Sequence, residues 1–198
     1  RIKCAVSWKS KSCIMILNSR NNLFNFKFNR NFIPKEVADK YRKYLNRMPG
    51  NVITEPIDFI NYSIQGVSIP GIAFDPIEQS PNDGTKTYHR GSIPIQNTIA
   101  DRQVAVELQL LDGYINYWIL QDTLLYYYSK TNKKPFLEDL KLQIMDAEGI
   151  HVMSAMFEKP IFNEISELEL NMSSNIAEFA TFTLNFYYNK FNIKLEID

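Results

Sequence analysis

Residues 179–188 read Phe-Ala-Thr-Phe-Thr-Leu-Asn-Phe-Tyr-Tyr and decide the fold class of this 198-residue chain. Every second residue from Ala180 to Phe186 is apolar, which is the spacing of a β-strand with one face against a core. The alternation runs on to Ile193, and Phe179 adds an apolar side chain to the opposite face. We therefore expect one long strand over 178–193 whose two faces are both partly covered, which suits an assembly better than a monomer.

Shorter alternating segments predict further strands upstream. Leu23–Phe28 places three phenylalanines on one face, and Gln103–Leu111 does the same with four aliphatic residues. Leu140–Ile144 leads through the turn Asp146-Ala147-Glu148-Gly149 into Ile150–Phe157, which is a hairpin pattern. Tyr62–Ser68 is a fifth candidate strand, and we expect a long polar loop over 75–92.

Three segments have helical spacing instead. Pro34 begins a helix over 34–48 that Pro49-Gly50 ends, and both Tyr41 and Tyr44 fall on its apolar stripe. A short helix is expected over Pro56–Asn61. A third, near 114–128, carries one apolar stripe made of Tyr114, Trp118, Leu125 and Tyr128, widened by Ile115 and Leu124. The sequence predicts an α+β fold, mainly antiparallel sheet, with one central helix.

The formal charge is zero, from 22 basic and 22 acidic residues, but it is unevenly distributed. Residues 1–14 contribute +4, residues 15–47 a further +6, and residues 48–198 contribute −10. A uniformly basic coat for nucleic acid is therefore not expected. Both cysteines, Cys4 and Cys13, lie in residues 1–14, which we interpret as a non-native extension or, alternatively, an ordinary arm; residues 15–198 are expected to form a single domain.

No residue pattern indicates catalysis, a metal or a cofactor. His89 and His151 stand outside any metal-spacing motif, and Glu167 and Glu169 lack a pocket that would make them an acid–base pair. Residues 83–86 lack the spaced glycines of a phosphate loop. An apolar run long enough to span a membrane is absent, as is a signal-peptide pattern, so we expect a non-enzymatic protein without a membrane partner.

The helix over 34–48 carries five cations on its polar side: Lys35, Lys40, Arg42, Lys43 and Arg47. A solvated face is the default interpretation of such a stripe. Docking to an acidic neighbouring subunit is the second interpretation, and contact with nucleic acid is the third. Because residues 48–198 are acidic, self-association is a further interpretation, in which the basic region of one copy contacts the acidic region of the next.

Four stretches occur in a recognisable order. They are Leu23–Phe28; Gln65–Ile72 with its Pro-Gly turn; Arg102–Leu111 with the aromatic helix Tyr114–Tyr128; and Ile165–Leu170 followed, after residues 171–175, by Glu178–Ile193. In this order the chain resembles the tail tube proteins of contractile-tailed, T-even-type bacteriophages, and the tube subunits of type VI secretion and extracellular contractile injection systems. The helical insertion over 34–61 departs from a minimal tube subunit, so a tube initiator, baseplate hub or tail-terminating adaptor is an alternative.

The resemblance implies a structural role without chemistry. It implies a β-barrel of the tail tube type, with six copies in a ring whose neighbouring strands close an inner barrel. Stacked rings would then form a virion tail tube, assembled in the host bacterial cytoplasm, that conducts DNA without binding it specifically. The implied partners are further copies and other tail proteins such as sheath, baseplate or terminator. An acidic lumen would repel DNA phosphates.

A monomeric β-barrel that binds a small ligand or peptide with its many aromatic residues is the alternative from another class. An enzyme would need a pocket that brings His89 or His151 to a carboxylate.

The uneven charge predicts that association of subunits is sensitive to salt. Ionic screening at high salt weakens attraction between a basic segment and an acidic one. We expect sedimentation velocity to show less of the associated species as NaCl is raised. Association that is equally strong at high salt would contradict an electrostatic contribution.

Overall fold

The computed structural model describes residues 22–47, 53–69, 71, 77–80, 86–89, 102–129, 137–168 and 180–196. The helices are α1 (Lys35–Leu45), α2 (Pro56–Tyr62) and α4 (Ile115–Ser129), the last preceded by a 3-10 turn over Asp112–Tyr114. The strands are β1 (Phe24–Phe26), β2 (Ile64–Ser68), β3 (Ile77–Gln79), β4 (Thr87–His89), β5 (Gln103–Gln109), β6 (Leu140–Met145), β7 (His151–Glu158), β8 (Ile161–Ile165), β9 (Thr181–Tyr187) and β10 (Lys190–Leu195).

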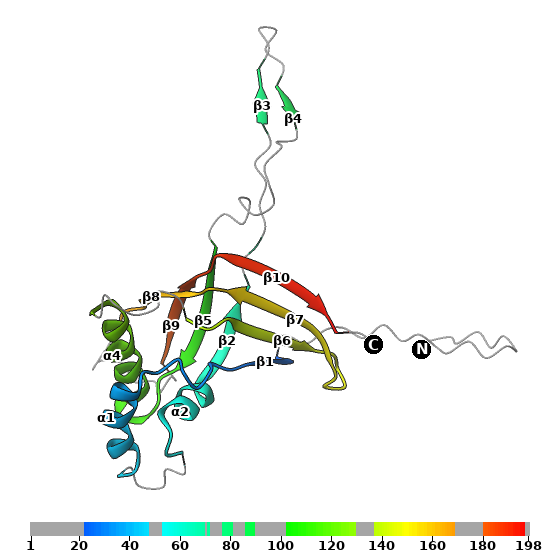
Figure 1. Cartoon of the computed structure of the whole chain (residues 1–198). Coiled ribbons are helices and arrows are strands. Elements are labelled where there is room, and N and C mark those ends of the chain that lie inside the picture. Colours follow the sequence, from blue (N-terminus) through cyan, green and yellow to red (C-terminus); the bar gives the residue numbers. More distant parts are fainter. Residues whose placement is uncertain are drawn as a thin grey trace, which may run out of the picture.

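Two four-stranded antiparallel sheets form the body. Sheet A has the strand order β1-β6-β7-β10, and sheet B has the order β2-β5-β9-β8. Their strands run across one another, and the three helices gather beside one end of the pair (Figure 1). The fold is thus the expected α+β class with mainly antiparallel sheet. Neither sheet closes into a barrel within the described residues, so the barrel remains a prediction for the assembly.

The expected single strand over 178–193 is two strands in different sheets. The chain passes from β9 in sheet B to β10 in sheet A at Tyr188 and Asn189. There the Tyr188 amide donates to the Arg102 carbonyl and the Asn189 amide to the Glu158 carbonyl, each at 3.0 Å. The corner coincides with a shift in the alternation, because the apolar positions are even-numbered up to Tyr188 and odd-numbered from Phe191. Such a shift by one residue exchanges the two faces of a strand, so a single strand over 178–193 was the wrong prediction. Phe179, expected to cover the second face, lies outside the described residues.

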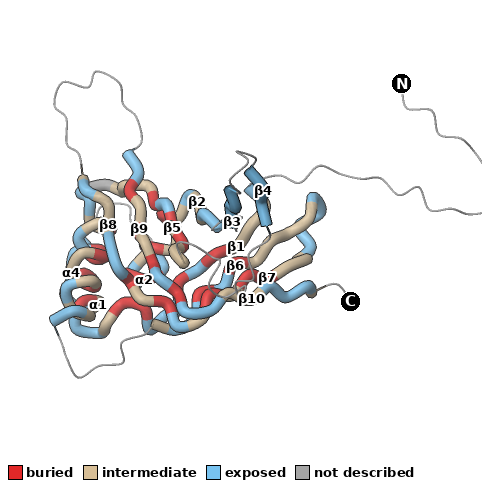
Figure 2. The backbone as a smooth tube through the Cα atoms, turned by 90° about the horizontal axis from the view of Figure 1, so that it is seen from above, coloured by how far each residue is buried: buried red, intermediate tan, exposed pale blue. Residues whose placement is uncertain are grey.

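Phenylalanines join the sheets at the centre of the core. Phe28 stacks on Phe32 with ring centroids 4.4 Å apart, and Phe28 lies 5.8 Å from Phe186 of β9. Phe162 of β8 stacks on Phe186 at 5.0 Å, which extends the cluster across sheet B. The buried segments meet where the two sheets and the helices converge (Figure 2). Such aromatic contacts combine large buried areas with favourable ring geometry.

The predicted hairpin and most predicted strands are confirmed. The turn closes with the Asp146 amide donating to the Ile150 carbonyl at 2.9 Å, and Gly149 takes the positive φ of 83° that favours glycine. The strand expected over Tyr62–Ser68 begins only at Ile64, because Tyr62 ends α2.

The polar loop expected over 75–92 contains a short antiparallel ribbon, β3–β4, whose strand residues are all exposed. The ribbon stands apart from both sheets in Figure 1.

The helices form where expected, but they bury different faces. In α1, Val37, Tyr41 and Leu45 are buried, whereas Tyr44 is 60% exposed and its predicted packing is wrong. In α4 the buried residues are Asn116, Ile119, Leu120 and Thr123 instead of the aromatic stripe. Asn116 turns inward because its amide donates to the Gln109 carbonyl at 2.7 Å and its oxygen accepts from the Leu111 amide at 3.2 Å. These bonds satisfy the buried polar group, so the stripe faces outward.

Replacing Phe186 with alanine tests the core. The Phe186→Ala variant leaves a cavity between Phe28 and Phe162, and we expect the free energy of unfolding to fall by about 3–5 kcal/mol. Urea denaturation followed by circular dichroism measures the change. Tyr187→Ala, at the neighbouring exposed position, is the control and is expected to cost about 1 kcal/mol or less. Similar losses in both variants would contradict this description of the core.

Candidate assembly surfaces

The residues considered for catalysis are not brought together. His89 is exposed on β4, whereas His151 lies on β7, where its Nε2 is 2.9 Å from the Ser154 hydroxyl and 3.1 Å from the Met153 carbonyl. Glu167 is exposed, and Glu169 and residues 83–85 lie outside the described part of the chain. Within that part, no group of His, Cys, Asp and Glu is arranged to hold a metal, and no helix is long and apolar enough to cross a membrane.

The basic residues of α1 separate into two groups. Lys40 forms an ion pair with Asp122 of α4 at 2.5 Å, and Arg42 pairs with Asp39 at 2.5 Å and with Glu55 at 2.9 Å. These two cations therefore hold α1 to its neighbours. Lys35, Lys43 and Arg47 are exposed and make no ion pair with a described residue. They are the members of the predicted docking set that remain available to a partner.

Asp122 is the centre of the contact between α1 and α4. Its carboxylate accepts from the Lys40 ammonium and, at 2.7 Å, from the Tyr41 hydroxyl. Partial burial opposes ionisation of Asp122, but the bonds from Lys40 and Tyr41 outweigh it, and the pKa of Asp122 is lowered. Burial, together with the bond to Asp122, raises the pKa of the Tyr41 hydroxyl far above its ordinary value. At neutral pH the Asp122 carboxylate is therefore charged, and the Tyr41 phenol is neutral.

A shallow hollow of about 380 Å³ lies beside this contact. Its lining residues are Asn31, Pro34, Lys35, Glu36, Tyr126 and Tyr127. The Tyr127 hydroxyl donates to the Phe32 carbonyl at 2.9 Å, so part of the wall is already used in holding α4 to the chain before α1. The hollow lies between α1 and α4 instead of inside a barrel, where the ligand-binding alternative expects a site.

The outward face of sheet B is mainly polar, apart from the paired Ile161 and Tyr187 at one end, and none of its strand residues is a cation. Its central residues are Gln103, Ala105, Glu107, Gln109, Thr181, Thr183 and Asn185, which alternate with the buried residues of β5 and β9. Glu164 of β8 joins them, and its carboxylate accepts from the Asn185 amide at 3.2 Å. The strands of sheet B contain Glu107 and Glu164 but no Lys or Arg. This face is therefore mildly acidic and otherwise neutral.

The polar face of sheet A has the opposite charge. Lys141 of β6 and Lys190 and Lys194 of β10 lie on it, as the pairing register shows, with Glu158 as the carboxylate among its strand residues. Lys190 approaches Glu158 at 3.5 Å, and Lys194 pairs with Glu196, the residue after β10, at 2.9 Å, so two of the three cations are compensated. The polar face of sheet A thus carries three cations, whereas the strands of sheet B carry none.

Among the described residues, each sheet ends in strands that have a neighbour on one side only. In sheet A these are β1 and β10, and in sheet B they are β2 and β8. An unpaired strand edge presents backbone donors and acceptors that can pair with another chain. The body therefore offers edges through which copies can join.

Comparison with known proteins gives structural likenesses only. No protein-family model matches the chain, and no curated protein matches it. The tube-terminating cap of the anti-feeding prophage is similar at a TM-score of 0.43 and 13% identity, over 67% of this chain and 80% of that chain. The sheath–tube complex of PVC, an extracellular contractile injection system, is similar at a TM-score of 0.43 and 12% identity. The match covers 67% of this chain and 80% of that chain.

A crystal structure of Hcp protein is similar at a TM-score of 0.31 and 13% identity, over 75% of this chain and 82% of that chain. A tube-terminating cap and a sheath–tube complex are proteins of the class that the sequence resembles. All three likenesses have TM-scores below 0.5.

Removing the charge of Asp122 should destabilise the protein in a pH-dependent way. Asp122→Asn keeps the shape of the side chain but loses the ion pair, and we expect a loss of about 1 kcal/mol at pH 7. Because the folded pKa of Asp122 is lowered, its contribution is present above the unfolded pKa and is lost as pH falls through the folded pKa. The difference between variant and parent should therefore shrink in acid.

Urea unfolding at pH 7 and at successively lower pH measures this difference. Glu167→Gln, a change at an exposed carboxylate outside the contact, is the matched control and should show no such trend. A loss for Asp122→Asn that is constant with pH would contradict the role assigned to the carboxylate.

Proposed function

We propose that this chain is a structural, non-enzymatic subunit of a tube in a contractile tail or injection system. The observation that carries the proposal is the absence of any cation from the strands of sheet B, whose outward face holds Glu107 and Glu164. Copies would form hexameric rings, as the resemblance to tail tube proteins implies, and rings would stack in a virion tail. Assembly would take place in the host bacterial cytoplasm.

A wall that conducts DNA needs to avoid holding it. Cations that neutralise phosphates supply most of the nonspecific affinity of proteins for DNA. Carboxylates repel phosphates. Amides and hydroxyls can hydrogen-bond to phosphates but have no charge with which to neutralise them. The outward face of sheet B has this composition, whereas the polar face of sheet A carries Lys141, Lys190 and Lys194. Sheet B is therefore the better candidate for the lumen, with DNA passing through unbound.

Ring closure follows from the same assignment. If sheet B lines the lumen, β8 of one copy lies next to β2 of its neighbour, and joining these edges continues the sheet around the ring. A closed barrel has no edge strands, which removes the risk of uncontrolled pairing. The barrel expected from the sequence then belongs to the ring and not to one chain.

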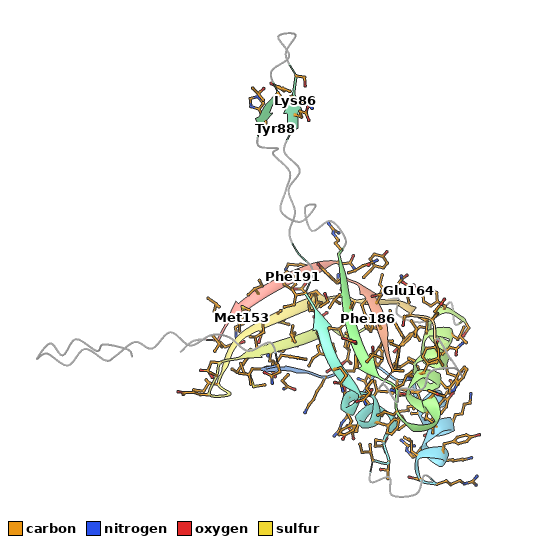
Figure 3. All side chains as sticks on the ribbon, turned by 180° about the vertical axis from the view of Figure 1, so that it is seen from behind. Lys86, Tyr88, Met153, Glu164, Phe186 and Phe191 are labelled. Atoms are coloured by element: carbon orange, nitrogen blue, oxygen red, sulfur yellow. The ribbon has the colours of Figure 1, made fainter. Side chains whose placement is uncertain are left out.

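Other parts of the chain suit contacts with neighbours along the tail. The β3–β4 ribbon has exposed strand residues and stands apart from the sheets, as an arm to an adjacent ring would (Figure 3, where Lys86 and Tyr88 mark it). The insertion over 34–61 presents the exposed cations Lys35, Lys43 and Arg47 to a neighbour, which is another copy of the chain or a tail protein such as sheath, baseplate or terminator. A single-ring relative of the tube, such as an initiator, hub or adaptor, is the alternative that this insertion favours.

Electron microscopy of the purified protein tests the proposal. Rings or tubes are the expected result, and a homogeneous 23.1 kDa monomer at all concentrations would contradict it. Images of the particle itself would separate a repeated tube subunit from a single ring.

Reversing the charge of the lumen should make it retain DNA. In the variant Glu107→Lys/Glu164→Lys, each ring gains cations where DNA passes, so assembled protein should bind DNA in a salt-dependent manner. A filter-binding assay at low and high salt measures this retention. The matched control is Asp58→Lys/Glu138→Lys, which makes the same charge change at exposed residues outside sheet B. Equal DNA retention by both variants would contradict the assignment of the lumen.

A further inference from the structure

The outward face of α4 is apolar and is not covered by any of the residues that the structure describes. Trp118 is 46% exposed, Leu125 is 59% exposed and Tyr128 is 60% exposed. They lie at helical spacing opposite the buried residues Asn116 and Thr123, so they form one stripe pointing away from the core. Large apolar residues that gather on one solvent-facing surface are typical of an interaction site.

The stripe continues onto α1. Lys40 pairs with Asp122 and the Tyr126 hydroxyl lies 3.4 Å from Glu36, so α1 and α4 run antiparallel in a fixed register. One more turn along each helix brings Tyr44 level with Trp118, and Tyr44 is also exposed. We call this surface, made of Tyr44, Trp118, Leu125 and Tyr128, the helical patch.

A second bare apolar surface lies on sheet A. Directly paired residues share a face, so Phe191 and Phe157, Ile193 and Ala155, and Leu195 and Met153 all belong to one face. That face is buried near the core, where Phe157 is fully covered, and it opens outward along β10, where Ile193 is 57% and Leu195 is 64% exposed. Met153, Ile193 and Leu195 form what we call the distal patch.

The two patches lie at opposite ends of the molecule. The helices stand at one end, and the β6–β7 turn and the end of β10 stand at the other, in both perpendicular views (Figures 1 and 2). In Figure 3, Met153 projects from the sheet at the end remote from the helices. A pair of different surfaces at opposite ends is the geometry of a head-to-tail contact, which closes into a ring when the rotation permits.

We propose that the helical patch of one copy packs against the distal patch of the next copy in the ring. This inference rests on the proposed ring and names the surfaces that join it in addition to the sheet edges. Charge supports the pairing, because Lys43 and Arg47 flank the helical patch, and Asp146 and Glu148 occupy the β6–β7 turn beside the distal patch. A two-fold contact between two helical patches would instead bring the cations of both copies together.

Cross-linking tests which surfaces meet. In a background with Cys4→Ser and Cys13→Ser, which removes both natural cysteines, the pair Leu125→Cys and Ile193→Cys is treated with a short bismaleimide. A ladder of covalent multimers is the expected result, because each copy offers one group at each end. The matched control replaces Ile193→Cys with Thr181→Cys, an exposed site on sheet B, and should give no ladder.

Substitution tests the energetic contribution. Trp118→Glu should weaken association about tenfold or more, since central tryptophans dominate many interfaces, whereas Tyr62→Glu, at an exposed tyrosine outside both patches, should not. Circular dichroism confirms that both variants fold. In a Trp8→Phe background, Trp118 is the one remaining tryptophan, and its emission should shift to the blue on assembly.

The outcomes separate the two proposals. Rings that assemble normally with Trp118→Glu, and that give no Leu125–Ile193 cross-link, would overturn this inference while the ring stands. Cross-linking of Leu125→Cys alone into dimers would overturn it in favour of a two-fold helix contact. A monomer without rings at any concentration would overturn the proposed function and this inference together.

Discussion

The stacking of Phe28 on Phe32, with Phe186 against both rings, is the contact on which the arrangement of the body depends. Phe28 follows β1, which belongs to sheet A, and Phe186 belongs to sheet B, so the cluster fixes one sheet on the other. The backbone of Phe28 is held in addition by the side chain of Asn61, whose oxygen accepts from the Phe28 amide at 2.8 Å. The inserted helix α2 is thereby tied to the first strand, and the insertion is part of the core architecture.

Most strands and helices could be predicted from the sequence, because local alternation and helical spacing reflect burial directly. Val104, Val106 and Leu108 are buried as their spacing indicates. The corner at Asn189 is marked in the sequence only by a one-residue shift of the apolar positions between Tyr188 and Phe191, and such a shift does not by itself distinguish a bulge in one strand from a change of sheet. The face of α4 could not be chosen by periodicity, since that helix is apolar nearly all round and the hydrogen bonds of Asn116 decide its orientation.

The candidate surfaces were only partly predictable for a related reason. A charge count along the chain places cations on α1. It does not show that Lys40 forms an ion pair with Asp122 and that Arg42 forms one with Glu55. Nor does the overall −10 of residues 48–198 locate the acids. The structure sorts the charges by sheet, and the absence of cations from sheet B becomes visible only when β2, β5, β8 and β9, which are distant in sequence, are seen side by side.

The corner between β9 and β10 has a mechanical meaning. Its two backbone bonds reach the residue before β5 and the last residue of β7, so one short segment is fastened to both sheets at once. A load applied to β10 is passed through a few covalent bonds to β9, in the middle of sheet B, without crossing a soft side-chain interface. In the proposed tube, which contraction would drive forward, this link would oppose sliding of the two layers at the corner and so contribute stiffness to the wall.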